Sequence, residues 1–349
     1  MGVEKQKVAF VTGVTGQDGA HLAAHLLRDG WRVYGGFRRG SSNKTWRIEQ
    51  LGIAKKIELV ECPLSEPQHI IEIFQSIKPD HVYNLAGESF VADSFKYPGV
   101  TLEVNTHGTL NILDAARLVS PQSRLFFASS SEVFGRGGVT GPCNESTLCR
   151  PSNPYGISKL AAQNFVSLYR ESYGLFACSG ILFNHEGPLR GREFVTRKIT
   201  FNIARLKVKG GPPIELGDMN AARDWGAADD YVEAMRAMLD QPEAKDMVIA
   251  SGSLTTVREF LRMAASAAGY DPVFEGERID EVCTDRHSGI RLAEVSARYF
   301  RPHDTPPMYG NPALIESETG WRRKCSLEQM IKEMISVDIN RWEKGMTNV

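Results

Sequence analysis

Short apolar runs alternate with segments of helical periodicity throughout the first half of the chain. The apolar runs cover residues 8–12, 31–36, 57–62, 80–86, 124–130 and 176–182. The helical segments between them cover residues 20–28, 68–77, 101–119 and 154–172. Strands that are apolar along their whole length are buried on both faces, and intervening helices complete βαβ units. The pattern therefore predicts an α/β fold built on a doubly wound parallel sheet.

The alternation stops near Phe183, and glycine and proline then cluster at residues 210–213 and 302–312. A chain of 349 residues has the length of two domains. We therefore expect a large domain formed by residues 1–182 and about 219–255. A smaller, mostly C-terminal α/β domain is expected from residues 183–218 and about 256–349.

The charges of the chain nearly cancel, with 41 Lys and Arg against 42 Asp and Glu. Such a balance argues against nucleic acid or an anionic membrane as a partner. The six cysteines show neither a C-x-x-C pair nor metal-ligand spacing, so we expect reduced thiols and no metal. Because no run approaches the ~20 apolar residues of a membrane span, we expect a cytoplasmic protein.

A glycine motif follows the first expected strand directly. It reads Gly13-Val14-Thr15-Gly16-Gln17-Asp18-Gly19 and leads into a helix. Small residues let the backbone approach a pyrophosphate, and the helix N-terminus supplies amide donors. An ordinary glycine-rich turn is the alternative, but the position between strand and helix favours a Rossmann-type dinucleotide site. Gly13, Thr15, Gly16, Gln17, Asp18 and Gly19 are therefore candidate cofactor ligands.

The end of the second expected strand predicts which dinucleotide binds. An acidic residue there would hold the ribose 2′-hydroxyl of NAD, whereas this chain has Phe37-Arg38-Arg39-Gly40-Ser41-Ser42. Guanidinium and hydroxyl groups suit a 2′-phosphate, so Arg38, Arg39 and Ser41 predict NADP. A solvated basic loop is the alternative interpretation.

Tyr155 and Lys159 lie four residues apart in an expected helix, about 25 residues after the hydroxyl-rich strand end Ser129-Ser130-Ser131. Residues at this spacing share one helix face, so the lysine can sit beside the phenol. An adjacent ammonium favours the phenolate and lowers the pKa of the tyrosine. The spacing alone is common in amphipathic helices, but together with the predicted NADP loop it indicates a catalytic pair.

This combination resembles the extended short-chain dehydrogenase/reductase superfamily over essentially the full chain. Five runs are similar to the GDP-mannose 4,6-dehydratase family: Thr15–Gly19, Gly180–Glu186, Phe194–Lys198, Arg223–Gly226 and Tyr299–Pro302. The resemblance implies a hydro-lyase that turns GDP-mannose into GDP-4-keto-6-deoxy-mannose with NADP. It also implies a homodimer or homotetramer and a role in deoxysugar biosynthesis.

Glu132 distinguishes this chemistry from that of related epimerases. The resemblance implies that Tyr155 takes the proton of the 4-hydroxyl while the C4 hydride passes to NADP. Glu132 then removes the C5 proton, water leaves from C6, and the hydride returns to C6. Ser130 is expected to bind near O4 and Lys159 to assist the phenol. A helix cap or half of an ion pair is the alternative role for Glu132.

The resemblance also implies ligands outside the motifs. The further residues expected at the cofactor are Leu64, Leu85, Ala86, Ser89, Lys159, His185 and Arg190. Those expected at the substrate are Ser89, Ser130, Glu132, Tyr155, Asn184, Thr196, Lys198, Arg223 and Arg301. A structural ion pair between Arg223 and Asp224, and a place in the core for His185, are the alternatives.

Several positions depart from the family pattern. Pro63 stands where an acidic residue is usual, Glu88 stands where a neutral glutamine is common, and Ser130 replaces a threonine. Val100 and Asp218 also replace more usual side chains. These departures leave the fold expectation intact and concern the substrate. The alternatives are another GDP-sugar such as a GDP-heptose, an epimerase, a 4-keto reductase, a decarboxylase, or a non-catalytic NADP-sensing module.

Overall fold

The computed structural model describes residues 6–38, 45–135, 141–300 and 307–347. The chain divides into two compact units. Unit 1 comprises residues 1–183, 228–250 and 310–322, and unit 2 comprises residues 184–227, 251–309 and 323–349. Within the described residues, no helix is both long and apolar enough to cross a bilayer.

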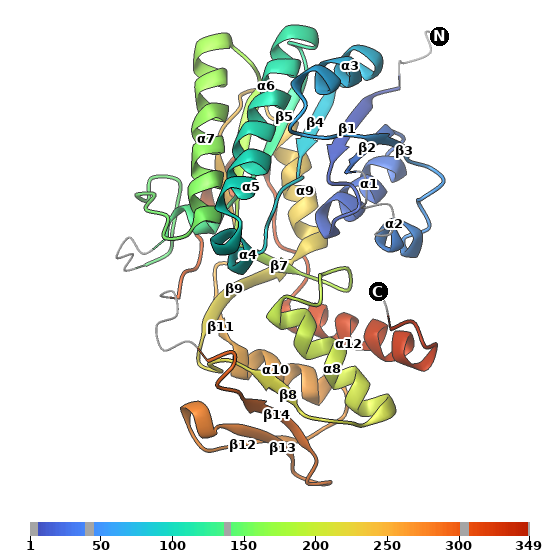
Figure 1. The fold of residues 1–349 in the computed structure, drawn as a ribbon, viewed down its shortest axis with the longest axis vertical. Coiled ribbons are helices and arrows are strands. Elements are labelled where there is room, and N and C mark those ends of the chain that lie inside the picture. The colour runs from blue at the N-terminus through green and yellow to red at the C-terminus, as the bar shows by residue number, and fades with distance from the viewer. Residues whose placement is uncertain (1–5, 39–44, 136–140, 301–306, 348–349) are drawn as a thin grey trace. The chain divides into compact units, whose positions relative to one another are not determined.

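Seven strands form one sheet in unit 1, in the order β10-β6-β5-β4-β1-β2-β3 (Figure 1). Every neighbouring pair is parallel, as the apolar pattern predicts. The strands are β1 (Val8–Thr12), β2 (Arg32–Phe37), β3 (Glu58–Glu61), β4 (His81–Asn84), β5 (Arg124–Ser130), β6 (Ala177–Leu182) and β10 (Met247–Ile249). The direction of strand order reverses between β1 and β4, and doubly wound sheets bind ligands at such a switch point.

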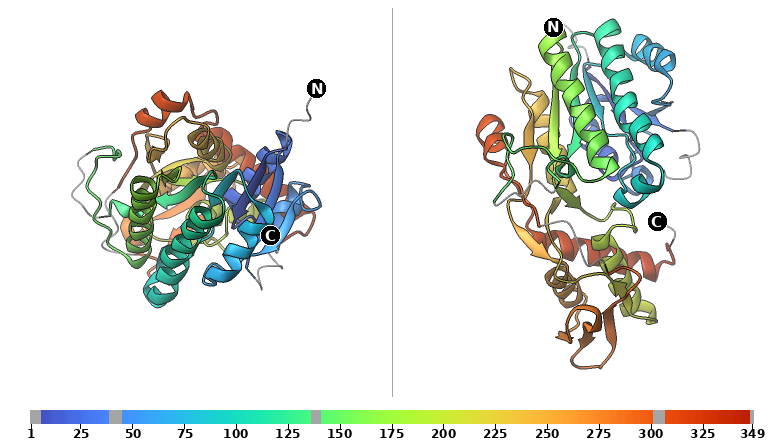
Figure 2. Two further views of the ribbon diagram at one scale, coloured as in Figure 1. Left: turned by 90° about the horizontal axis from the view of Figure 1, so that it is seen from above. Right: turned by 60° about the vertical axis from the view of Figure 1, so that its left-hand side comes forward.

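Helices connect these strands and pack on the sheet. Side chains from α3, α6 and α7 share one apolar core with β1, β4 and β5, while α1 packs against α9. Figure 2 shows α6 and α7 side by side, in teal and green. The helices of unit 1 are α1 (Gln17–Arg28), α2 (Trp46–Gln50), α3 (Pro67–Ile77), α4 (Val91–Lys96), α5 (Pro98–Leu102), α6 (Gly108–Val119), α7 (Pro154–Tyr173), α9 (Ala228–Leu239) and α11 (Ala313–Thr319).

The helix predicted over residues 101–119 is interrupted. α5 ends at Leu102, a π-helical turn η2 spans Glu103–His107, and α6 follows at once. A π-turn adds a residue to one helical turn and often occurs at functional sites. Hydrophobic periodicity does not report such a turn, because the apolar face continues on either side.

The described residues of unit 2 form two small sheets and three α-helices. One sheet has the order β11-β9-β7 and the other has the order β12-β13-β14-β8. Its elements are β7 (Asn184–Glu186), α8 (Val195–Lys209), β8 (Ile214–Leu216), β9 (Ala222–Ala227), β11 (Leu254–Thr256), α10 (Val257–Ala267), β12 (Pro272–Glu275), η4 (Arg278–Asp280), β13 (Val282–Asp285), β14 (Arg291–Val295) and α12 (Leu327–Glu343). Helices α8, α10 and α12 share an apolar core with β8 and β14.

The two units differ from the predicted domains at three segments. Residues 219–227 and 251–255 belong to unit 2, because β9 and β11 pair in its three-stranded sheet. Residues 310–322 belong to unit 1, where Gly310 pairs with Cys143 and α11 packs against β10. Sequence periodicity cannot assign such short segments, because their pairing partners are distant in the chain.

A charged cluster is buried in the helical layer of unit 2. Asp338 is fully buried, pairs with Arg197, and accepts hydrogen bonds from Thr200 Oγ1 (3.0 Å) and Arg341 Nη1 (2.9 Å). Burial lowers the pKa of Arg197 to about 10, and the charge of Asp338 offsets part of this effect. One carboxylate therefore joins α8 to α12.

Asp338→Ala is expected to lower the free energy of unfolding by about 3–5 kcal/mol, because it leaves two buried guanidinium groups without their carboxylate. Urea denaturation followed by circular dichroism measures the loss. The control is Glu259→Ala, which removes an exposed ion pair with Arg262 and should cost less than about 1 kcal/mol. Equal losses for the two variants would contradict the prediction that the buried Asp338 cluster contributes more to stability than the exposed ion pair.

Candidate active site

The predicted glycine loop joins β1 to α1 as expected. Gly16 is the N-cap of α1, and Asp18 lies in its first turn. A Cβ on Gly19 would lie 2.4 Å from the carbonyl oxygen of Gly13, so only glycine allows the helix to start this close to the loop. The first-turn N–H groups of α1 are thereby presented beside a turn with little side-chain bulk, which is the form of a phosphate site.

The end of β4 is held against this loop by a hydroxyl group. Thr12 Oγ1 donates to Asn84 Oδ1 (2.9 Å) and accepts from the backbone N–H groups of Leu85 and Ala86 (3.1 Å each). These contacts bring two predicted cofactor residues, Leu85 and Ala86, beside the glycine loop. Another predicted residue, Leu64, is buried and accepts a 2.7 Å hydrogen bond at its carbonyl from Asn111.

An ion pair connects the ends of β2 and β4. Arg38 Nη1 lies 3.1 Å from Glu88 Oε1, and both side chains are substantially exposed. Because β1 lies between β2 and β4, this pair spans the strand that carries the glycine loop. Arg39 and Ser41 lie outside the described residues. Arg47, which sequence reasoning missed, donates a 3.1 Å hydrogen bond to the carbonyl of Thr15.

The end of β5 and the short helical turn that follows it carry two of the predicted catalytic residues. Ser130 ends β5, and Glu132 lies in the 3-10 turn η3 (Ser131–Val133). Ser130 Oγ accepts the backbone N–H of Glu132 (3.3 Å). Glu132 Oε2 accepts a 2.7 Å hydrogen bond from Asn153 Nδ2, directly before α7. The turn and the start of α7 are therefore in contact.

Tyr155 and Lys159 lie on α7 and are both buried. Lys159 Nζ lies 5.9 Å from the centroid of the Tyr155 ring and donates a 2.8 Å hydrogen bond to the carbonyl of Ala128. Burial lowers the pKa of Lys159 to about 8, and the negative charge of Asp18 in the glycine loop offsets part of this effect. The lysine thus interacts with the end of β5 through a hydrogen bond and with the glycine loop through the charge of Asp18.

The π-turn η2 contacts the turn of α7 that carries Tyr155 and Lys159. Asn105 Nδ2 donates to Ser158 Oγ (2.9 Å), between Tyr155 and Lys159, and Asn105 Oδ1 accepts the N–H of Glu88 (2.9 Å). One buried asparagine therefore ties α7 to the loop after β4. Sequence reasoning missed Asn105 because it lies inside a stretch with ordinary helical periodicity.

In unit 2, the buried carboxylate of Glu186 contacts two of the predicted binding residues, Thr196 and Arg190. Glu186 Oε2 accepts a 2.5 Å hydrogen bond from Thr196 Oγ1 and lies 3.0 Å from Arg190 Nε. The Arg190 guanidinium also lies 3.6 Å from the centroid of the Phe194 ring. Thr196 is fully buried, His185 is buried on β7, and the other predicted residue of that strand, Asn184, is half-buried. Glu186 was not among the predicted residues.

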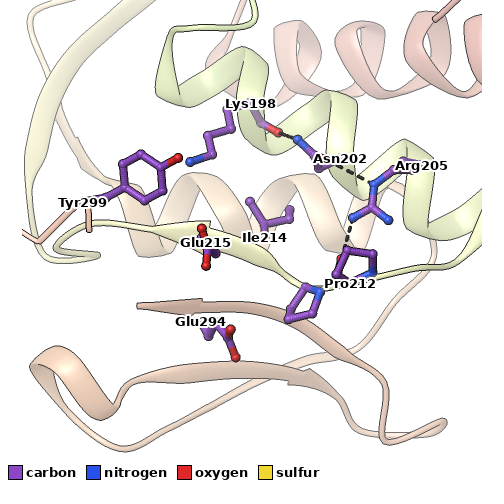
Figure 3. Close-up of a pocket in the computed structure, with 9 residues that line it drawn as sticks. Lys198, Asn202, Arg205, Pro212, Ile214, Glu215, Glu294 and Tyr299 are labelled. Carbon is purple, nitrogen blue, oxygen red and sulfur yellow. Dashed lines mark hydrogen bonds between the residues drawn. The ribbon is translucent and has the colours of Figure 1, made fainter. Parts of the chain in front are cut away.

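A cavity of about 500 Å³ lies in unit 2 between α8 and the four-stranded sheet (Figure 3). Lys198 and Tyr299 point toward each other at one side, with Lys198 Nζ 3.7 Å from the ring centroid. Burial lowers the pKa of Lys198, and the charge of Glu215 opposes this shift. The full lining is Lys198, Asn202, Arg205, Pro212, Pro213, Ile214, Glu215, Glu294 and Tyr299.

The remaining predicted residues have individual environments. Arg223 is half-buried on β9 and donates a 2.8 Å hydrogen bond to the carbonyl of Ala222. Its neighbour Asp224 is buried and accepts backbone N–H groups from Ser251 and Gly252. Ser89 is exposed after β4, and Arg301 lies outside the described residues.

The structure brings together the predicted groups of unit 1, namely the glycine loop, the end of β4, Ser130, Glu132, Tyr155 and Lys159. Each group comes from the carboxyl end of a strand or from the helix that follows it. Within the described residues, no cluster of three His, Cys, Asp or Glu side chains could hold a metal ion. The arrangement offers a dinucleotide loop beside a phenol, an ammonium and a carboxylate, which can move protons next to a bound nicotinamide.

A doubly wound sheet with this loop after β1 and a Tyr-x-x-x-Lys pair on α7 defines an enzyme of the extended short-chain dehydrogenase/reductase superfamily. The solved structure of RMD from Pseudomonas aeruginosa, complexed with NADPH, has the same fold, with a TM-score of 0.75 and 24% identity over 96% of this chain and 100% of that one.

Sequence comparison defines the family. The family model described as GDP-mannose 4,6 dehydratase matches residues 10–334. GDP-mannose 4,6 dehydratase 2 of Caenorhabditis elegans is 41% identical over 344 residues, which are 96% of this chain and 90% of that protein. GDP-mannose 4,6-dehydratase of Yersinia enterocolitica is 40% identical over 352 residues, 96% of this chain and 94% of that protein. The chain belongs to the GDP-mannose 4,6-dehydratase family.

Lys159→Met is expected to stabilise the fold by about 1–3 kcal/mol at pH 7, because it removes a buried ammonium whose pKa of about 8 reflects its desolvation. The unfolded chain holds this proton up to about pH 10.5, so the stability of the unsubstituted protein rises between pH 8 and 10.5. The gain from Lys159→Met should shrink over the same window.

Thermal unfolding at pH 7, 8.5 and 10 measures this effect. Lys209→Met, at an exposed position on α8, is the control and should leave the unfolding temperature unchanged at each pH. A Lys159→Met variant that is less stable at pH 7 would contradict the expected desolvation cost.

Proposed function

We propose that this protein is an NADP-dependent GDP-mannose 4,6-dehydratase, which converts GDP-mannose to GDP-4-keto-6-deoxy-mannose. The family supplies the reaction class of a hydro-lyase. The observation that carries the proposal is the turn after β5, where Glu132 meets the start of the helix that carries Tyr155 and Lys159. A phenol and a carboxylate in one site are the two acid–base groups that the reaction needs.

The glycine loop fits a dinucleotide, since a side chain at Gly19 would overlap the carbonyl of Gly13 and the positive end of the α1 dipole lies beside this turn. The proposed cofactor contacts of unit 1 are Gly13, Thr15, Gly16, Gln17, Asp18, Gly19, Leu64, Leu85, Ala86, Ser89 and Lys159. Arg38, at the end of β2, supports NADP over NAD because its guanidinium matches a 2′-phosphate. Arg39, Ser41, His185 and Arg190 belong to the same proposal.

When bound, the nicotinamide of NADP supplies the redox chemistry, taking the hydride of sugar C4 and returning it to C6. Tyr155 takes the proton of the 4-hydroxyl as a phenolate, which the nearby charge of Lys159 favours. Ser130 donates a hydrogen bond near O4 and stabilises the charge that develops there. The ketone at C4 acidifies C5–H, and Glu132 removes that proton. Glu132, now protonated, donates this proton to the 6-hydroxyl, which leaves as water. When hydride adds to C6, C5 must regain a proton, and the Tyr155 phenol, protonated in the first step, can supply it, which restores the phenolate.

The proposed contacts to the nucleotide part of the substrate come from unit 2. A diphosphate needs cations, and Lys198, Arg223 and Arg301 can supply them. Lys198 lines the cavity in Figure 3, where the Tyr299 ring offers a flat surface to a base. Asn184 and Thr196 complete the proposed set, with Thr196 acting through its hydrogen bond to Glu186.

A homodimeric or homotetrameric state and a cytoplasmic location are part of the same proposal. Exposed apolar side chains on helices α4 to α7 support self-association, among them Phe95, Leu102, Leu118, Ile157 and Leu168. Ile157 and Leu168 are eleven residues apart, so they project from the same side of α7. Apolar side chains gathered on adjacent surface helices are typical of an interface.

Incubation of the purified protein with GDP-mannose and catalytic NADP tests the activity. Mass spectrometry should show a product lighter by one water, with no net formation of NADPH. In Glu132→Gln the sugar should keep its 6-hydroxyl, because no water is eliminated. Reduced nicotinamide should accumulate, because C4 oxidation still proceeds. Glu171→Gln, an exposed carboxylate on α7, is the control and should behave like the unsubstituted protein. Normal dehydration by Glu132→Gln would exclude Glu132 as the base.

Arg38→Ala is expected to weaken NADP binding by about tenfold or more, with little change for NAD, because only NADP carries the 2′-phosphate. Glu88→Gln should tighten NADP binding by up to about fivefold, since it releases Arg38 from an exposed ion pair worth at most about 1 kcal/mol. Titration calorimetry with each dinucleotide measures both effects. Equal losses for NAD and NADP in Arg38→Ala would contradict the assignment of Arg38.

A further inference from the structure

The Asn153 side chain lies between the turn that carries Glu132 and the helix that carries Tyr155. Its Nδ2 donates a 2.7 Å hydrogen bond to Glu132 Oε2, and its Oδ1 accepts a 2.8 Å hydrogen bond from the N–H of Gly156. These partners define the orientation of the amide, because a backbone N–H only donates and a carboxylate only accepts. Asn153 is therefore at once the N-cap of α7 and a donor to Glu132.

The backbone at Asn153 has little freedom to move. The residue is buried and extended, with φ −145° and ψ 158°, and Pro154 follows it as the first residue of α7. A residue before proline is restricted to extended conformations, and proline at this position presets the helical dihedral. The amide that contacts Glu132 is thus attached to a rigid point of the chain.

The backbone of Glu132 is held by the same two elements. Ser130 Oγ accepts its N–H at 3.3 Å. A Cβ on Gly156 would lie 2.5 Å from the carbonyl oxygen of Glu132, so the glycine lets α7 begin directly against the turn. With the backbone held in this way, the contact with Asn153 determines where the Glu132 carboxylate points.

We propose that Asn153 is a positioning residue for the dehydration step, holding one carboxylate oxygen of Glu132 so that the other faces C5–H. This inference rests on the proposed function, in which Glu132 is the base. A neutral amide suits the task, because it orients the carboxylate without the full positive charge of Lys or Arg, which would depress its basicity more strongly. Because the same amide caps α7, the carboxylate and the phenol of Tyr155 are positioned from one point.

Two substitutions separate the positioning role from the capping role. Asn153→Asp keeps the size and the capping oxygen but places a second carboxylate against Glu132. Asn153→Ser keeps a capping oxygen but lacks the amide donor. Since Asn and Ser are comparable N-caps, Asn153→Ser should not lower the unfolding temperature by the amount expected for a lost cap, whereas the repulsion between Glu132 and the new carboxylate adds a cost of its own in Asn153→Asp. Asn153→Ala, which removes both functions, calibrates that loss.

For Asn153→Asp we expect kcat to fall by about tenfold or more with KM nearly unchanged, since general base catalysis contributes about 10²–10⁴-fold. Reduced nicotinamide should accumulate during turnover, because C4 oxidation precedes the slowed removal of the C5 proton. Asn153→Ser should show the same accumulation with a smaller loss of kcat. If Asn153 had only a structural role, the variants would lose stability, and C4 oxidation and removal of the C5 proton would slow together.

Crystal structures of both variants without ligands give a second readout that is independent of activity. Glu132 should leave its present position in Asn153→Asp and adopt more than one conformer in Asn153→Ser. Unchanged Glu132 positions together with unchanged kcat in both variants would overturn the inference. If the unsubstituted protein fails to dehydrate GDP-mannose while Glu132 moves as expected, the proposed function fails and the positioning contact stands.

Discussion

The parallel arrangement of seven strands is the constraint on which the rest of unit 1 depends. Because every neighbouring pair is parallel, all carboxyl ends lie at one edge of the sheet. The loops after β1, β2, β4 and β5 must therefore meet there, whatever their separation in the chain. For that reason, this edge carries the glycine loop, Arg38, Glu88 and Glu132. The helices on both faces of the sheet bury its apolar strands.

Polar groups buried at this edge hold the site in one arrangement. Thr12 joins the glycine loop to the end of β4, and Asn105 joins the loop after β4 to the turn of α7 that carries Tyr155 and Lys159. Each is buried and makes several hydrogen bonds, so either contact is costly to break. The desolvation of Lys159 opposes stability, as its lowered pKa indicates, and the surrounding network must compensate for it. Such preorganisation lets a site favour a charged transition state.

Within the superfamily architecture, the dehydratase chemistry is proposed to come from one added carboxylate. In this proposal, Tyr155 and Lys159 of α7 move the proton of a hydroxyl group, and Glu132 adds a second acid–base group for the adjacent carbon. Its position two residues after Ser130, in η3, places it against the start of α7, where Asn153 contacts it. The same short segment thereby combines the cap of a helix with the orientation of a base. Unit 2 carries the cations proposed for the nucleotide part, among them Lys198, which lines the cavity beside α8.

The sequence by itself determined the alternation of strands and helices, the glycine loop between β1 and α1, and the shared helix face of Tyr155 and Lys159. These features are local: periodicity, small residues and a spacing of four are properties of neighbouring positions. Contacts between distant segments were decided only by the tertiary structure. No local pattern relates the segments that meet in these contacts. Examples are the hydrogen bonds of Asn105 in the π-turn, the contact of Glu132 with Asn153, the Arg38–Glu88 ion pair and the packing of residues 310–322 in unit 1. The physical reason is that packing and strand pairing, rather than propensity, bring such segments together.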